Sequence, residues 1–232
     1  MMTIKAILFD LDDTLWPVGP VIRHAEQTLH DWLAVHTPQV TEVYDIEALR
    51  QRRQSLVVTD PRFSYDLWSL RHRLLQEVMA EQGADPAHAD AAMQVFAHAR
   101  NQVSLYEDVI PALQQLQADF ITGSVSNGFA DLHSIGLAPY FRVSLAAHSF
   151  GCAKPDSRIF LAACDALQVA PHETLYVGDD VLLDVHGATQ AGLQAVWMNR
   201  HSISANKPEW QHVTIPAQIR DLHDLRQRLT RV

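Results

Sequence analysis

The stretch Ile7-Leu8-Phe9-Asp10-Leu11-Asp12-Asp13-Thr14-Leu15-Trp16 decides the fold of this chain. The apolar run from Ile4 to Phe9 is typical of a short buried strand, and three acids follow it directly. In an open α/β sheet, ligands bind at the carboxyl ends of the strands. Asp10 and Asp12 lie two residues apart, so their side chains share one side if the strand continues. Because two carboxylates this close repel each other, the pattern favours a hard divalent cation such as Mg²⁺ between them.

The composition is that of an ordinary globular protein. The chain has 232 residues, 47% of them hydrophobic, which is enough for one large domain or two small ones. The net charge of −9 argues against a nucleic-acid partner and against a basic membrane-binding surface. No run approaches the roughly 18 apolar residues that span a membrane. The N-terminal apolar run is short and does not resemble a secretory leader, so we expect a cytoplasmic protein. The two cysteines, Cys152 and Cys164, are then expected to be reduced thiols. The protein is expected to be a monomer or a homodimer.

Two kinds of pattern divide the chain. Residues 17–103 show apolar side chains at helical spacing and no convincing strand, as in Leu67, Leu70, Leu74, Leu75 and Val78. Strands alternate with helices after that segment, and the final helix is expected from about Pro216, with Ile219 on its apolar face. The order predicts an α/β fold, a doubly wound parallel Rossmann-like sheet formed by residues 1–16 and 104–232. An all-helical domain, residues 17–103, is inserted into it.

Three later segments of the α/β region end in residues that carry chemistry. Ser126-Asn127-Gly128 follows the second strand and offers a hydroxyl and N–H groups to a phosphate, although a helix-capping serine with a turn glycine is the simpler interpretation. Lys154 precedes a helix, where the helix dipole disfavours a cation and a surface lysine is the usual reading. The run from Gly178 to Asp184 follows the fourth strand, and an acidic helix start would also explain its three acids.

These four motifs resemble, in their order, the motifs of the haloacid dehalogenase superfamily. The first motif of that family is a strand followed by Asp-x-Asp-x-Thr, which Asp10, Asp12 and Thr14 match. The resemblance implies a helical cap domain and, because Asp12 is present, the phosphatase branch rather than the dehalogenase branch. The run from Phe9 to Trp16 and the later Val-Gly-Asp-Asp are most similar to bacterial phosphatases of the flavin pathway, which act on FMN or on 5-amino-6-(5-phosphoribitylamino)uracil.

The resemblance implies a Mg²⁺-dependent phosphatase that acts on a small phosphorylated metabolite through an aspartyl-phosphate. In that scheme Asp10 is the nucleophile, Asp12 the general acid and base, and Lys154 the neutralising cation. The expected Mg²⁺ ligands are Asp10, Asp12 through its carbonyl oxygen, Asp179 and, in support, Asp184. The expected substrate contacts are Thr14, Ser126, Asn127, Gly128, Trp16 and, in the helical domain, Arg71.

Several alternatives stay open at this level. Either Asp180 or Asp184 could support the metal. Trp16 is equally well explained as an aromatic residue of the core. Most arginines of the helical domain are expected on solvent-exposed helix faces. A phosphomutase shares the fold, and a haloacid dehalogenase is disfavoured by Asp12. A signalling receiver domain also combines aspartates, a hydroxyl and a lysine, but this chain is too long for one. A non-catalytic phosphate-binding protein would be expected to lack at least one of four residues, and all four are present: Asp10, Asp12, Lys154 and Asp179.

Overall fold

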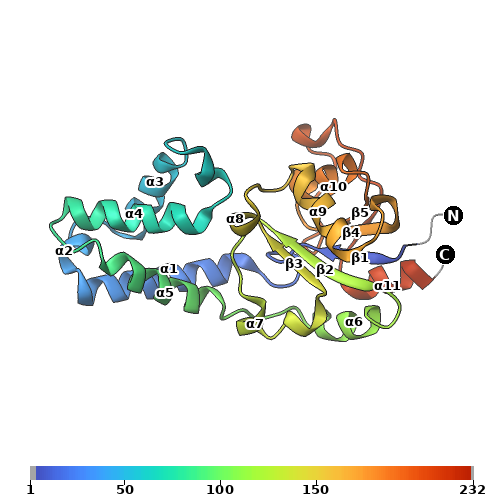
Figure 1. Cartoon of the computed structure of the whole chain (residues 1–232), viewed down its shortest axis with the longest axis horizontal. Helices are drawn as coiled ribbons and strands as arrows, with labels where there is room; N and C mark the ends of the chain where they lie inside the picture. Colours follow the sequence, from blue (N-terminus) through green and yellow to red (C-terminus); the bar gives the residue numbers. More distant parts are fainter. Residues whose placement is uncertain (1–3, 231–232) are drawn as a thin grey trace. The chain divides into compact units, whose positions relative to one another are not determined.

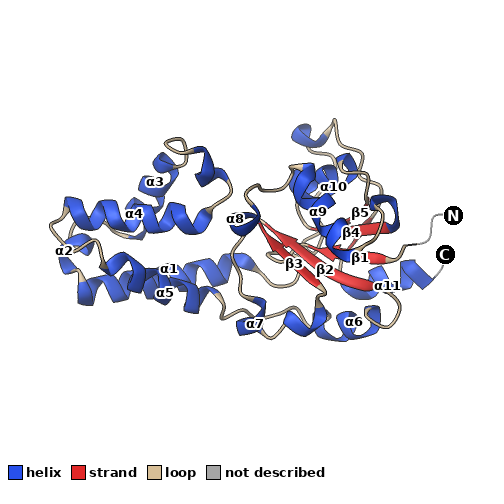
Figure 2. Ribbon diagram, viewed as in Figure 1, coloured by secondary structure: helices blue, strands red, loops and turns tan. Residues whose placement is uncertain are grey.

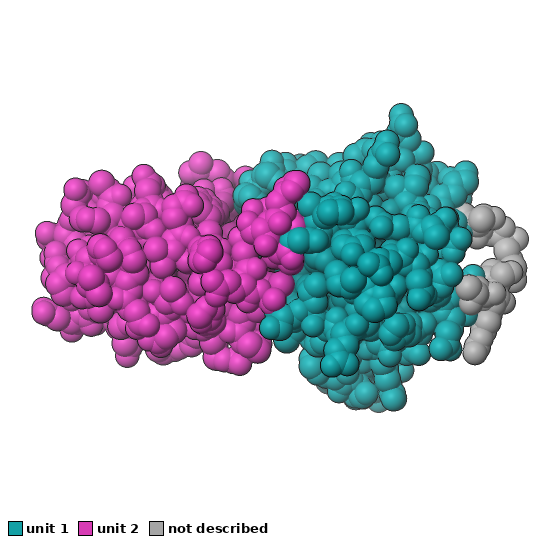
Figure 3. Space-filling view, turned by 90° about the horizontal axis from the view of Figure 1, so that it is seen from below, with its two compact units in different colours: residues 1–17, 104–128, 136–232 teal, residues 18–103, 129–135 magenta. Residues whose placement is uncertain are grey.

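The structure is a computed structural model that describes residues 4–230, so the ends of the predicted α/β domain, 1–3 and 231–232, lie outside the described residues. The chain divides into two compact units (Figure 3). The first, called here the α/β unit, comprises Met1–Pro17, Ser104–Gly128 and Gly136–Val232. The second, the helical unit, comprises Val18–Val103 and Phe129–Ile135. This division groups residues 129–135 with the helical unit, whereas the sequence-based boundary of the helical domain is residue 103.

The α/β unit is built on one parallel sheet (Figure 2). Its strands are β1 (Ala6–Phe9), β2 (Ile121–Ser126), β3 (Val143–Ala146), β4 (Thr174–Gly178), β5 (Gln194–Met198) and β6 (Gln218–Ile219). They follow the spatial order β3-β2-β1-β4-β5-β6, and every pair is parallel. All four residues of β1 are completely buried, because β1 lies between β2 and β4 in the middle of the sheet. The predicted doubly wound fold class is confirmed.

Helices cover both faces of the sheet (Figure 1). The helices of this unit are α6 (Val109–Leu116), α8 (Ala147–Phe150), α9 (Ser157–Leu167), the π-helical turn η4 (Val181–His186), α10 (Gly187–Gln190) and α11 (Leu222–Thr230), with 3₁₀ turns η2 (Ala138–Tyr140), η3 (Pro171–Glu173) and η5 (Pro208–Trp210). α9 and α10 pack together, and so do α6 and α11. Phe160 of α9 packs edge-on against Tyr176 of β4, with ring centroids 4.9 Å apart. This aromatic contact joins α9 to the sheet.

The C-terminal prediction was wrong in one respect. Ile219 does not belong to the final helix but to β6, where it pairs with Met198 of β5, and α11 begins only at Leu222. Backbone bonds at both ends hold this sixth strand: the Trp197 N–H donates to the Ala217 carbonyl (2.9 Å) and the Asn199 N–H to the Ile219 carbonyl (2.8 Å). A strand of two residues leaves no periodic pattern in the sequence, so only the pairing with β5 creates it.

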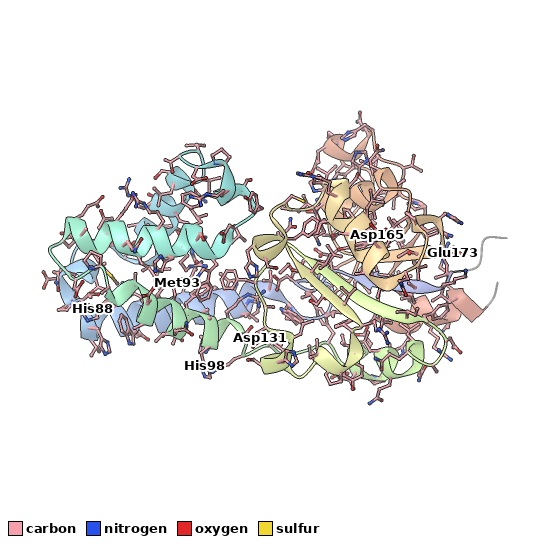
Figure 4. The ribbon with its side chains drawn as sticks, in the orientation of Figure 1. His88, Met93, His98, Asp131, Asp165 and Glu173 are labelled. Atoms are coloured by element: carbon pink, nitrogen blue, oxygen red, sulfur yellow. The ribbon has the colours of Figure 1, made fainter. Side chains whose placement is uncertain are left out.

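The helical unit contains α1 (Val18–His36), α2 (Pro38–Thr41), α3 (Ile46–Leu56), the 3₁₀ turn η1 (Pro61–Ser64), α4 (Leu67–Glu81), α5 (His88–Arg100) and α7 (Leu132–Ile135). The described residues of this unit form no strand, as predicted. The carboxylates of Asp45 and Asp66 cap α3 and α4 by accepting N–H donors of the first turn. Met93 of α5 is buried, and His98 of the same helix is exposed (Figure 4). Within residues 4–230, none of the helices has the length and apolar character that a bilayer-spanning segment needs.

A buried ion pair ties several parts of the α/β unit together. Both terminal nitrogens of Arg200 donate to the Asp108 carboxylate at 3.0 Å, and the same carboxylate accepts the N–H of Leu222 at the start of α11 (2.8 Å). Arg200 also donates its Nε–H to the Thr14 carbonyl (2.9 Å) and lies over the ring of Tyr106. The pair therefore anchors the loop that follows β1.

We predict that Asp108→Asn destabilises the protein by about 3 kcal/mol at neutral pH, because it leaves the Arg200 charge unpaired. Burial acts to raise the pKa of Asp108, but Arg200 and the Leu222 N–H outweigh it and hold this pKa below its ordinary value. A depressed pKa means that the unfolded chain binds more protons, so the contribution is complete above about pH 4 and is lost as pH falls through the folded value. Urea unfolding of both proteins at neutral pH and again below about pH 4 measures this contribution.

Glu173→Gln is the matched control for this experiment. The Glu173 carboxylate pairs with Lys5 at 2.6 Å, but that lysine side chain is 58% exposed, and exposed pairs contribute roughly 0–1 kcal/mol. The difference in unfolding free energy between the Asp108→Asn variant and the unchanged protein should become smaller in acid. An unfolding free energy that is unchanged by Asp108→Asn at neutral pH would contradict the proposed role of the pair.

Candidate active site

Three aspartates meet at the carboxyl ends of β1 and β4. Asp10 follows β1, Asp179 follows β4, and Asp184 lies in η4 just beyond it. Each offers one carboxylate oxygen, and these oxygens all lie within 4.8 Å of one another. Because β1 and β4 are paired neighbours in a parallel sheet, their ends lie at the same edge. The structure thus brings together three of the four expected metal ligands.

Lys154 lies inside this group of acids. Its ammonium donates to the carboxylates of Asp10 (2.5 Å) and Asp184 (2.7 Å) and to the hydroxyl of Tyr176 (3.1 Å). The residue is only 4% exposed, so it is not a surface lysine. Its three N–H donors match three oxygen acceptors, which is what a buried ammonium requires. We define Asp10, Asp179, Asp184 and Lys154 as the charged cluster.

The charged cluster holds more negative than positive charge. Burial, followed by repulsion from Asp10, Asp184 and Asp13, raises the pKa of Asp179 to about 9. Burial likewise raises the pKa of Asp184 to about 6, although Lys154 acts in the opposite direction. Burial acts to lower the pKa of Lys154, but attraction to Asp10 and Asp184 outweighs it and holds this pKa well above its ordinary value. A hard divalent cation with oxygen ligands fits these three carboxylates, because it would supply the missing positive charge.

The loop after β1 fixes the fourth acid, Asp12. The indole N–H of Trp16 donates to the Asp12 carboxylate (2.8 Å), and the Asp13 N–H donates to the Trp16 carbonyl (2.7 Å). Asp13 adopts a positive φ of 56°, which aspartate tolerates better than most residues. The Asp12 carboxylate is not part of the group of three acids. Trp16, an expected substrate contact, is completely buried and serves to orient Asp12.

Thr14 and Trp197 hold Asp179 from two directions. The Thr14 hydroxyl donates to the Asp179 carboxylate (3.2 Å), and the indole N–H of Trp197 donates to the Asp179 backbone carbonyl (2.8 Å). Thr14 is completely buried. Trp197 was not among the predicted site residues, because nothing in its local pattern distinguishes it from a core aromatic of β5. Its role appears only from its contact with Asp179, the residue that follows β4.

The motif after β2 is joined to the lysine. Asn127 makes two bonds with the backbone of Lys154: its amide donates to the Lys154 carbonyl (3.1 Å), and its side-chain oxygen accepts the Lys154 N–H (2.8 Å). The Ser126 hydroxyl oxygen accepts the Gly128 N–H (3.0 Å). Asn127, an expected substrate contact, therefore positions Lys154 relative to the end of β2.

The two candidate acids of η4 have different partners. The Asp180 carboxylate accepts the N–H groups of Leu182 and Leu183, both at 2.8 Å, and so caps the start of η4. Asp184 turns back into the charged cluster, and its second carboxylate oxygen accepts the Asp180 N–H (2.9 Å). In this structure, Asp184 rather than Asp180 is placed to support a metal.

Arg71 lies in the interior of the helical unit. Its guanidinium carbon is 3.7 Å from the ring centre of Phe96, and its nearest carboxylate is that of Glu26, at 3.6 Å. The side chain is almost fully buried among residues of this unit. Its expected contact with substrate stays a prediction.

Gly178 allows the close approach of Asp184 to β4. A Cβ at this position would lie 2.4 Å from the Asp184 carboxyl carbon, so an alanine must push Asp184 away. We predict that Gly178→Ala lowers stability by about 1–3 kcal/mol and weakens the affinity of the three acids for a divalent cation, measured by urea unfolding and by calorimetric titration with Mg²⁺. At the control position, Gly19, a Cβ meets only the far end of the Arg23 side chain, so Gly19→Ala should give the same titration as the unchanged protein. An unchanged titration in Gly178→Ala would show that cation binding does not require the position of Asp184.

Comparisons with known proteins agree in the kind of fold and differ in the activities they name. A family model described as haloacid dehalogenase-like hydrolase matches residues 4–192. The 5-amino-6-(5-phospho-D-ribitylamino)uracil phosphatase YigB of Escherichia coli (strain K12) is 33% identical over 199 residues, which cover 84% of this chain and 83% of that protein. A phosphoserine phosphatase of Thermus thermophilus is 31% identical, over 96% of this chain and 98% of that protein. The crystal structure of a 2-haloacid dehalogenase from Pseudomonas syringae pv. Tomato DC3000 matches with a TM-score of 0.91 at 36% identity, over 99% of both chains.

Proposed function

Because this chain belongs to the haloacid dehalogenase-like hydrolase family, we propose that it is a Mg²⁺-dependent phosphatase that acts on a small phosphorylated metabolite through an aspartyl-phosphate on Asp10. The prediction of a hydrolase of this superfamily is confirmed by the family match and by relatives that are named phosphatases. The observation that carries the finer proposal is the buried contact between Asp10 and Lys154, which places a charge-balanced carboxylate at the end of the central strand.

In the first step, a carboxylate oxygen of Asp10 forms a bond to phosphorus and the bond from phosphorus to the leaving oxygen breaks. Asp12, in its protonated form, gives its proton to that oxygen, and the alcohol leaves. The Trp16 indole holds the Asp12 carboxyl in place for this transfer. Asp12 ends the step as a carboxylate.

In the second step, Asp12 takes a proton from water as the water oxygen bonds to phosphorus, and the bond from phosphorus to Asp10 breaks. Inorganic phosphate leaves, Asp10 regains its carboxylate and Asp12 its proton, so the net reaction is hydrolysis of one phosphate ester by one water molecule. Lys154 balances the charge of the Asp10 carboxylate before the first step and again after the second. Ser126 and Gly128, at the end of β2, would contact the phosphoryl oxygens.

The expected Mg²⁺ ligands are Asp10, Asp179 and, from the sequence, the carbonyl oxygen of Asp12, with Asp184 in support. Bound Mg²⁺ would neutralise the charge of the phosphoryl group.

The proposed substrate is FMN or a phosphate of the riboflavin pathway. The support is the 33% identity to the phosphatase YigB, together with the similarity of the motifs around Asp10 and Asp179 to flavin-pathway phosphatases. Relatives named for other small phosphates also cover most of this chain, among them a glyceraldehyde 3-phosphate phosphatase of Methanopyrus kandleri at 29% identity. The substrate therefore has to be measured against a panel.

We predict Mg²⁺-dependent phosphate release, largest on FMN or the ribitylaminouracil phosphate, from a panel that also includes phosphoserine and glyceraldehyde 3-phosphate. Removal of divalent metal with EDTA should abolish the release, and added Mg²⁺ should restore it. In the control variant Asp10→Asn, release should fall by about 10³-fold or more while urea unfolding shows an intact fold, because an amide is a poor nucleophile. Turnover that persists in Asp10→Asn would contradict the covalent scheme.

A second candidate function is 2-haloacid dehalogenation, which is favoured by the 36% identity to a protein of that name. Asp12 separates the two functions, since the phosphatase branch has an acid at this position and the dehalogenase branch lacks it. Halide release from 2-chloropropionate, measured in the same assay series, tests it. Halide release without any phosphate release would replace the phosphatase proposal.

Tyr176 is proposed as a positioning residue for Lys154. Its hydroxyl donates to the Val125 carbonyl (2.8 Å) and accepts from the Lys154 ammonium (3.1 Å). We predict that Tyr176→Phe lowers kcat by about tenfold with little change in KM, because one N–H of the lysine loses its acceptor. Tyr140→Phe is the control, since within residues 4–230 the Tyr140 hydroxyl has a single long hydrogen bond, accepted from Gln114 (3.4 Å). Equal kcat values in the two variants would remove this role from Tyr176.

A further inference from the structure

Trp197 of β5 holds the backbone of the aspartate that follows β4. The pairing of β4 with β5 ends at Gly178 and Trp197, and Asp179 lies one residue past this last pair. The Asp179 carbonyl accepts the indole N–H of Trp197 (2.8 Å), and Trp197 is completely buried. An indole has one hydrogen-bond donor and no acceptor, so this bond uses the whole polar capacity of the side chain. The backbone just beyond the sheet is thus held by a side chain.

The peptide group between Asp179 and Asp180 is held at both of its polar atoms. Trp197 binds the carbonyl oxygen, and the second carboxylate oxygen of Asp184 accepts the Asp180 N–H (2.9 Å). The Thr14 hydroxyl donates to the Asp179 carboxylate itself (3.2 Å). Rotation of this peptide group would break its bonds to two buried side chains, those of Trp197 and Asp184. These bonds therefore fix the direction in which the Asp179 side chain leaves the backbone.

A second indole restrains Trp197. Trp210 of η5 packs edge-on against the Trp197 ring, with ring centroids 5.5 Å apart. The ammonium of Lys207 lies 4.3 Å from the centre of the Trp210 ring. Trp210 belongs to the segment 199–217, which joins β5 to β6, and it packs against the core of the α/β unit. Aromatic pairs prefer this edge-on geometry, so the contact restricts rotation of the Trp197 ring.

We propose that Trp197 is a positioning residue for binding of the divalent cation, and that Trp210 acts through it. The role of Trp197 rests on the proposed function, because it requires Asp179 to be a ligand of Mg²⁺. Oxygens of Asp10, Asp179 and Asp184 already lie within 4.8 Å of one another, and the indole bond keeps Asp179 in that arrangement. A ligand held in place before the ion arrives needs no reorientation, so the affinity is higher. Trp197 itself offers a cation no ligand atom.

The test is a calorimetric titration of the full-length protein with Mg²⁺. Trp197→Phe removes the donor and keeps an aromatic ring in the core. It should weaken Mg²⁺ affinity by about 10- to 100-fold, the usual effect of removing a group that supports a metal ligand. Trp32→Phe is the matched control, because Trp32 lies in the helical unit, where its ring stacks on His36 with centroids 4.1 Å apart. The control should bind Mg²⁺ as the unchanged protein does.

A second replacement of Trp197 separates the hydrogen bond from packing. Benzothienylalanine has sulfur in place of the indole N–H and keeps the shape of the two fused rings, so the contact with Trp210 is retained. With this residue at position 197, the protein should fold and should lose Mg²⁺ affinity as Trp197→Phe does. If Trp197 acted only by packing, this replacement would keep the affinity of the unchanged protein, and that result would overturn the proposal.

Trp210→Leu tests whether Trp210 acts through the indole of Trp197. Alone, this change should weaken Mg²⁺ affinity by less than Trp197→Phe does, because the bond to Asp179 is loosened but not removed. Added to Trp197→Phe, it should cause no further loss, because the bond through which it acts is already absent. Additive losses in the double variant would show that the two indoles act independently and would remove this role from Trp210.

The unchanged protein distinguishes failure of this role from failure of the proposed function. If the unchanged protein binds Mg²⁺ and Trp197→Phe binds it with the affinity of Trp32→Phe, the role of Trp197 is wrong and the Mg²⁺ site stands. If the unchanged protein gives no heat of binding with Mg²⁺, the cation site of the proposed function is wrong, and the role of Trp197 is wrong with it.

Discussion

The α/β unit depends most on the buried contact of the Lys154 ammonium with the carboxylates of Asp10 and Asp184. Three aspartates this close together, two of them buried, repel one another, and the free energy of that repulsion has to be offset by positive charge. Lys154 supplies one charge at the carboxyl end of the central strand. The remaining excess of negative charge is the physical reason for expecting a divalent cation at the same place.

Most residues of the candidate site are held by neighbours that have no chemistry of their own. Asn127 fixes the backbone of Lys154, the Tyr176 hydroxyl fixes its ammonium, and Trp16 fixes the carboxyl of Asp12. Behind them, the Asp108–Arg200 pair anchors the loop after β1. Such support makes the charged groups rigid before any substrate arrives, so little reorganisation has to accompany the reaction.

The sequence by itself determined the fold class and the residues of the four motifs, because apolar strands that end in acids, a hydroxyl or a lysine are local patterns. It did not reveal the strand at Ile219 or the burial of Arg71 against Glu26. It also gave no sign that Trp197 supports Asp179. Only the tertiary structure decided these features, since most of them depend on contacts between residues far apart in the chain, and local periodicity carries no information about such contacts.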